Sequence, residues 1–191
     1  MNRREALLAL GGAAVLADPL FAASRTLHAR LTSGAALKVL DPHQNDTVVM
    51  IAEMIIPATD TPGATAAKVN EFVDLGLSEW FEAEERKRFL DGIADLDARS
   101  RKRFTKDFIT SAPEQRTELL QLLDAEVAGL RDADRQGLHR EGTPAQGFFR
   151  MMKRLTLLGY FTSEVGATEE LNNPIIPGRY DGCTMVEERR R

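Results

Sequence analysis

The chain is poor in the residues and motifs that bind metals and cofactors. Its 191 residues include one cysteine and three widely separated histidines, so neither an iron–sulfur cluster nor a histidine-based metal site is expected. It also lacks a C-x-x-C-H haem motif, a G-x-G-x-x-G or phosphate-binding loop, and a G-x-S-x-G nucleophile elbow. Without these motifs the chain is predicted to be non-catalytic on its own.

An excess of positive charge is also missing. The chain carries 25 basic and 29 acidic residues, and this balance argues against a nucleic-acid partner. Acidic pairs such as Glu82/Glu85 and Asp91/Asp95 are interpreted as surface ion pairs rather than as a general acid and base. One basic cluster is predicted to be a solvated helix face: Arg99, Arg101, Lys102, Arg103 and Lys106.

The N-terminus has no apolar run of the roughly 20 residues that span a bilayer. It has instead Arg3 and Arg4, followed by an Ala/Gly-rich stretch over residues 6–17. This pattern predicts that residues 1–23 are a twin-arginine export signal, with a general secretory signal as the alternative. Residues 15–17 and 22–23 both offer a cleavage point, and an uncut signal would remain as a membrane-proximal tail. The predicted location is the periplasm.

Start and stop signals divide the middle of the chain into helices. Asp41–Pro42 and Thr143–Pro144 each predict a helix start, and Ser111 with Glu114 is interpreted as a capping box. Gly159 is expected to close the last helix. Apolar residues recur at helical spacing over 48–56, 69–81, 89–96, 104–108, 119–130 and 148–158.

No segment alternates as a strand does, so the predicted fold is all-α: a small bundle of about five to six helices over residues 24–159. Residues 58–64 form a turn between helices, in which Asp60, Pro62 and Gly63 supply the turn chemistry.

The C-terminal residues 160–191 differ from the bundle. Prolines and glycines interrupt them, yet they keep more aromatic and branched apolar residues than a disordered tail would. They are predicted to form an extended, irregular arm that docks either on its own helices or on a partner chain. Cys183, the single cysteine, is either an inert thiol or the site of a disulfide to another chain.

A signal for exporting folded proteins, on a chain without cofactor ligands, suggests that the cargo is a second protein bound to this one. Several short motifs then resemble the gluconate 2-dehydrogenase subunit 3 family. They are IIP (55–57), DTPGA (60–64), FVD (72–74), LTLLGYFTSEVG (155–166) and PGRYDGC (177–183). Together with the twin arginines, they span nearly the whole chain.

The resemblance implies a non-catalytic small subunit that escorts and stabilises a large flavoprotein of the glucose–methanol–choline oxidoreductase type. That partner would hold FAD and oxidise a sugar or polyol, with electrons passing through an iron–sulfur cluster to a cytochrome c. The chain would use the twin-arginine translocation machinery and associate with the membrane through its complex. The alternative is a free-standing periplasmic binding or scaffold protein. The candidate partner contacts are Asp60, Pro62, Gly63, Tyr160, Phe161, Glu164, Pro177, Gly178, Tyr180 and Cys183.

Overall fold

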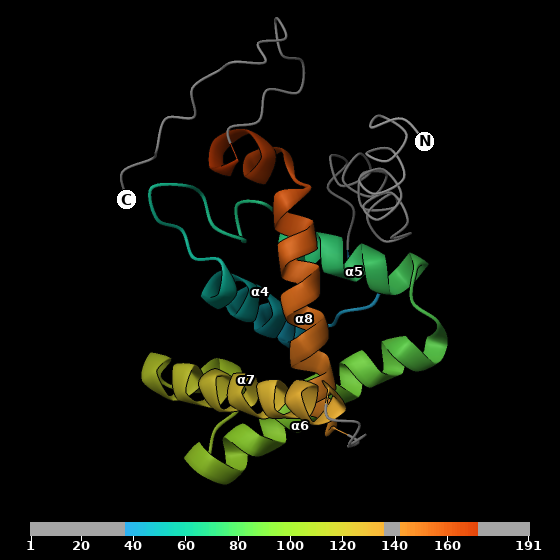
Figure 1. The fold of residues 1–191 in the computed structure, drawn as a ribbon, viewed down its shortest axis with the longest axis vertical. Helices are drawn as coiled ribbons and strands as arrows, with labels where there is room; N and C mark the ends of the chain where they lie inside the picture. The colour runs from blue at the N-terminus through green and yellow to red at the C-terminus, as the bar shows by residue number, and fades with distance from the viewer. Residues whose placement is uncertain (1–36, 136–141, 172–191) are drawn as a thin grey trace, which may run out of the picture.

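The protein is helical throughout the part of the chain that the structure describes. This computed structural model describes residues 37–135 and 142–171. In chain order the elements are α4 (Pro42–Ile55), α5 (Val69–Glu79), α6 (Ala83–Phe104), the 3₁₀ turn η2 (Phe108–Thr110), α7 (Pro113–Arg135), α8 (Pro144–Phe161) and the π-helical turn η3 (Gly166–Glu170) (Figure 1). These residues contain no strand, and the predicted all-α fold is confirmed.

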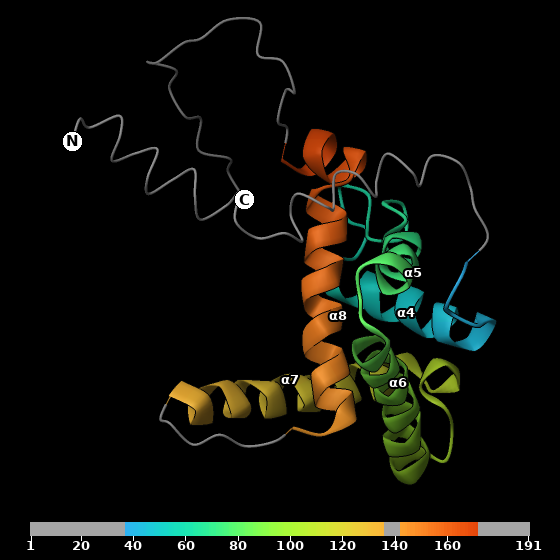
Figure 2. The ribbon, with the colours of Figure 1, turned by 90° about the vertical axis from the view of Figure 1, so that its right-hand side faces the viewer.

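Helix α8 is the centre of the fold. It contacts α4, α5, α6, α7 and η3, and Figures 1 and 2 show the other helices arranged along it. Its buried face includes Phe148, Met152 and Leu155. Burying side chains of this size stabilises the fold by about 1.5–3 kcal/mol each. One long apolar helix therefore organises the core, and its two ends meet different neighbours.

Helices α6 and α8 approach closely at Gly92. A Cβ atom at this position would lie 2.2 Å from Phe148 Cβ and 2.8 Å from the Pro144 carbonyl oxygen. The Phe89 and Phe148 rings pack edge to face beside it, with their centroids 4.9 Å apart. Only glycine lets the helices reach this separation without displacing backbone atoms.

Two of the predicted helix starts are confirmed. Asp41 caps α4 and Thr143 caps α8, each in a capping box with a glutamine and each followed by proline. The interpretation of Ser111 and Glu114 as a capping box is wrong by one residue. Helix α7 begins at Pro113, and the side chain of Gln115 accepts from the Ala112 backbone N–H.

Ser111 does not cap α7 because its hydroxyl is used elsewhere. Its Oγ donates to the Asp107 carbonyl at 2.9 Å and lies 3.0 Å from Ser100 Oγ on α6. The residue is buried against α6, where an unsatisfied hydroxyl would be costly. Tertiary packing therefore overrides the local capping signal.

The last helix ends two residues later than predicted. Gly159 lies inside α8, where a Cβ atom would approach Phe72 Cδ1 to 2.8 Å, so this glycine serves packing against α5 rather than termination. The predicted arm, residues 160–191, therefore starts within α8, which runs to Phe161. Residues 172–191 of the arm lie outside the described residues.

Phe104 and Phe108 do not share a helix as the spacing suggested. Thr105, with a φ of 64°, ends α6 between them, and Phe108 begins η2. The predicted basic helix face is confirmed for Arg101, Lys102 and Arg103, which are exposed on α6, whereas Arg99 is half-buried and Lys106 lies beyond the end of the helix. Arg99 and Arg103 on this face pair with carboxylates of α7.

Candidate partner-binding site

The described candidate contacts gather where the turn after α4 meets the C-terminal end of α8. We call residues 57–68 and 160–171 together the α8 junction. The candidates found there are Asp60, Pro62, Gly63, Tyr160, Phe161 and Glu164. The remaining candidates, Pro177, Gly178, Tyr180 and Cys183, lie outside the described residues, as do the export arginines Arg3 and Arg4.

Tyr160 joins the two parts of the α8 junction. Its hydroxyl donates a hydrogen bond of 2.7 Å to the Pro62 carbonyl, across a sequence separation of 98 residues. The tyrosine is 1% exposed, so its side chain faces the interior of this chain. A second link lies nearby, where the Thr61 hydroxyl donates to Glu170 at 2.7 Å. Tyr160 and Pro62 therefore hold the junction together from inside.

Glu53, at the end of α4, shapes the turn. Its carboxylate accepts from the backbone N–H of Ala58 and of Thr65, each at 2.9 Å, and from the Thr65 hydroxyl at 2.6 Å. Partial burial alone would raise the pKa of Glu53. The hydrogen bonds from Thr65 and Ala58 outweigh that effect, so the pKa lies below its usual range. This role was not predicted, because Glu53 occupies an ordinary helical position in the sequence.

Gly63 is required by this arrangement. A Cβ atom there would lie 2.4 Å from a Glu53 carboxylate oxygen and 2.5 Å from the Ala58 backbone nitrogen. Any side chain would therefore displace the carboxylate that organises the turn.

A compact turn follows Tyr160 at the end of α8. The Ser163 hydroxyl donates to the Tyr160 carbonyl at 2.6 Å and accepts from the Gly166 backbone N–H at 3.1 Å. A Cβ atom at Gly166 would lie 2.1 Å from the Tyr160 carbonyl oxygen, so η3 can start here only with glycine. Ser163 therefore satisfies two backbone groups of this turn from within the chain.

The outer face of the α8 junction remains accessible. Phe161 is 38% exposed, and its ring packs edge to face on Tyr160 with centroids 5.3 Å apart. Leu157, one turn earlier on α8, is 46% exposed, and Asp60 and Glu164 are exposed carboxylates. The junction therefore places an aromatic ring and charged groups on a rigid support, an arrangement that suits a protein partner.

Asp74, the last residue of the FVD motif, fixes the start of the described chain. Its buried carboxylate accepts from the backbone N–H groups of Lys38, Val39 and Leu40, at 2.7, 2.9 and 2.8 Å. This clamp sets where the chain following the predicted signal joins the helical body.

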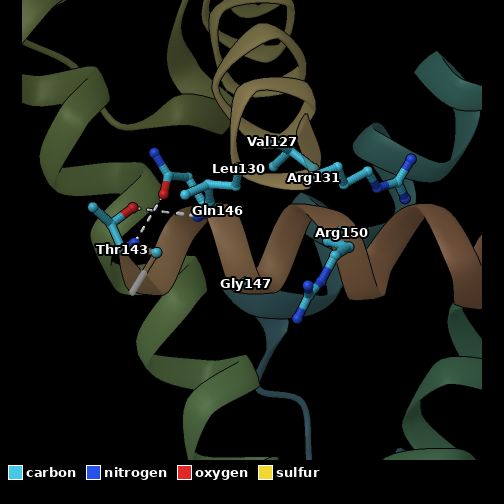
Figure 3. Close-up of a pocket in the computed structure, with 8 residues that line it drawn as sticks. Val127, Leu130, Arg131, Thr143, Gln146, Gly147 and Arg150 are labelled. Atoms are coloured by element: carbon cyan, nitrogen blue, oxygen red, sulfur yellow. Dashed lines mark hydrogen bonds between the residues drawn. The ribbon is translucent and has the colours of Figure 1, made fainter. Parts of the chain in front are cut away.

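The N-terminal end of α8 carries two hollows, one on each side of Gly147. A hollow of about 210 Å³ lies between α7 and α8 and is lined by Arg131 and Arg150 (Figure 3). A second, of about 320 Å³, lies against α6, where Arg88 and Arg150 line it. Apolar side chains such as Phe148 form part of its wall.

The acidic pairs singled out from the sequence have structural partners. Glu85 reaches back to the Glu82 backbone in the capping box of α6, and Asp91 pairs with Lys87. Asp95 accepts from the Ala145 backbone N–H at 3.0 Å, tying α6 to the start of α8. These carboxylates therefore stabilise helices and their contacts.

Within residues 37–135 and 142–171, no group of three or more His, Cys, Asp or Glu side chains could hold a metal ion. None of the described helices is both long enough and apolar enough to span a bilayer.

Comparison with known protein families gives one match. Residues 42–178 match the family model of gluconate 2-dehydrogenase subunit 3, and the match includes α4 through η3 and the whole α8 junction. Neither the curated proteins nor the solved structures gave a match. Since the family model covers well over half of the chain, the chain belongs to the gluconate 2-dehydrogenase subunit 3 family.

Proposed function

We propose that this member of the gluconate 2-dehydrogenase subunit 3 family is the non-catalytic small subunit of a periplasmic, FAD-dependent sugar or polyol dehydrogenase complex. Its partner is a large flavoprotein of the glucose–methanol–choline type, which this chain stabilises and escorts through the twin-arginine pathway. A cytochrome c accepts the electrons. The observation that carries the proposal is the family match, which contains every described helix and the junction residues.

The described carboxylates support a structural rather than a catalytic role. Glu53 and Asp74 each bind several backbone N–H groups. A general acid or base must be free to exchange a proton with a substrate. These groups are instead committed to holding turns and helix ends.

The flavin belongs to the partner chain in this proposal. A dinucleotide cofactor uses a helix N-terminus to bind its phosphates. In the described part of this chain, the N-termini of α4, α6 and α8 are closed by their own capping boxes, through Asp41, Glu82 and Thr143. These helix ends do not fit a flavin phosphate.

The α8 junction supplies a contact surface in this proposal. Tyr160, Pro62 and Gly63 support it from inside, and Asp60, Phe161 and Glu164 lie on its outer face. Aromatic side chains are enriched at protein interfaces, and polar groups lie around them at the rim.

Purification of the tagged full-length chain from the periplasm tests the proposal. We expect a large subunit with a flavin absorption spectrum to purify with it in a fixed ratio. Replacing Arg3 and Arg4 together by lysine should leave the dehydrogenase activity in the cytoplasm. A chain that purifies alone, or normal periplasmic activity in the double variant, would contradict the proposal and favour a free-standing scaffold protein.

A further inference from the structure

The N-terminal end of α8 carries arginines that the described chain does not neutralise. Every other arginine in the described residues has an interaction partner. Arg88, Arg131 and Arg150 are exposed and make no hydrogen bond or ion pair with those residues. The same three arginines line the two hollows beside Gly147, which we call together the arginine surface.

Two acidic groups near the arginine surface are already paired. Asp91 is the one carboxylate among the described residues that line the hollows, and it pairs with Lys87 at 2.5 Å. Glu126, on the adjoining face of α7, pairs with Arg99 at 2.9 Å. The chain is acidic as a whole, yet this surface is locally positive.

Gly147 has no role that the described chain explains. It is exposed within α8, and a Cβ atom there would meet nothing within 4 Å. Glycine in an exposed helix is less favourable than alanine. The other helical glycines of the centre, Gly92 and Gly159, let a neighbouring side chain approach closely. Gly147 would in the same way allow the backbone of another chain to approach α8 closely.

The directions of the arginines favour an extended partner over a single ion. Figure 3 shows Arg131 of α7 and Arg150 of α8 pointing in different directions, with Gly147 beside Arg150 on the same helix. One small anion could not bridge guanidinium groups that diverge in this way, whereas a peptide with spaced carboxylates could reach both. The wall formed by Phe89, Phe148 and Met151 adds room for an apolar side chain.

We propose that the arginine surface binds an acidic segment of the partner dehydrogenase subunit. Its carboxylates pair with Arg88, Arg131 and Arg150, and its backbone passes over Gly147. A partner without carboxylates would bury unpaired guanidinium groups, which is strongly unfavourable. This inference rests on the proposed function and adds a second contact surface, at the opposite end of α8 from the junction.

Charge reversal in the full-length complex tests the inference. Arg150→Glu should weaken the binding of the purified flavoprotein subunit by at least about tenfold, and the effect should shrink at high salt. Lys106→Glu is the matched control, because Lys106 is also exposed and has no partner among the described residues. It should change binding by less than about twofold. If the two variants weaken binding equally, or if neither weakens it, the inference is overturned. The proposed complex with the flavoprotein would still stand.

Two further variants separate a binding role from a structural one. Gly147→Ala should weaken binding without lowering the melting temperature, whereas Gly129→Ala, at another open helical position, should leave binding unchanged. In Arg150→Lys, a zero-length carbodiimide should link the introduced amine to an Asp or Glu of the flavoprotein. Crosslinks elsewhere in the complex but none at position 150 would overturn the inference. A chain that binds no flavoprotein at all would overturn the proposed function as well.

Discussion

The two ends of α8 differ in how much charge is left unpaired at the surface. At the C-terminal end, Tyr160, Ser163 and Gly166 direct hydrogen bonds into the chain, and the turn from α4 is fastened to them. At the N-terminal end, Arg131 and Arg150 direct charge outward and find no partner among the described residues. The family motifs at the junction therefore specify a rigid support. The residues best placed for a charged partner lie outside those motifs.

The largest expected effect is at Gly166. Gly166→Ala places a methyl group on the Tyr160 carbonyl oxygen, a backbone atom that cannot rotate away. We expect unfolding by denaturant to show a loss of about 3 kcal/mol. Gly147→Ala is the control at the other end of the helix. A loss below about 0.5 kcal/mol at Gly166 would show that the junction is not rigid.

Tyr160→Phe should have the next largest effect. It removes the donor to the Pro62 carbonyl and keeps the buried ring, so we expect a loss of about 1.5 kcal/mol in chemical unfolding. Glu164→Ala changes an exposed neighbour and should cost less than about 0.5 kcal/mol. If both variants lowered the free energy of unfolding equally, the buried Tyr160 would support the junction no more than the exposed Glu164 does.

Glu53 makes the junction sensitive to acid. The pKa of its carboxyl is lowered in the folded chain from the ordinary value of 4.5. The stabilisation is therefore present above pH 4.5 and is lost as the pH falls through the folded pKa. Glu53→Gln should reduce stability by about 1 kcal/mol at pH 7 and by less at pH 3. Thermal unfolding across this range measures the difference, and a gap that stays constant with pH would contradict it.

The smallest expected effect on stability is at Gly147, at the N-terminal end of α8. Gly147→Ala and Gly129→Ala both replace an exposed helical glycine with open space around its Cβ position. Each should raise the free energy of unfolding by about 0.5–1 kcal/mol. A destabilised Gly147→Ala protein would mean that this glycine serves the fold and not a partner.

Local signals predicted the parts of the fold that depend on neighbouring residues. The starts of α4 and α8 were correct because an N-cap residue followed by proline acts within one helical turn. Ser111 and Gly159 were misread because their roles depend on distant partners, Asp107 with α6 in one case and Phe72 in the other. Such contacts between distant residues cannot be predicted from local sequence patterns.

The contacts within the candidate site could not be predicted from the sequence either. Resemblance singled out Tyr160 and Pro62 but could not show that one binds the other. Glu53 was missed because a glutamate in a helix carries no signal of its three hydrogen bonds. The arginine surface was also missed, because whether an arginine is paired depends on which carboxylates the fold brings near it.

Amide hydrogen exchange on the full-length chain, alone and bound to its flavoprotein, tests the division between the two ends most directly. We expect the amides of residues 158–166 to be protected in both states. Amides of residues 142–151 should exchange at least about tenfold more slowly only in the complex. Unprotected junction amides in the free chain, or no slowing over residues 142–151 on binding, would contradict it.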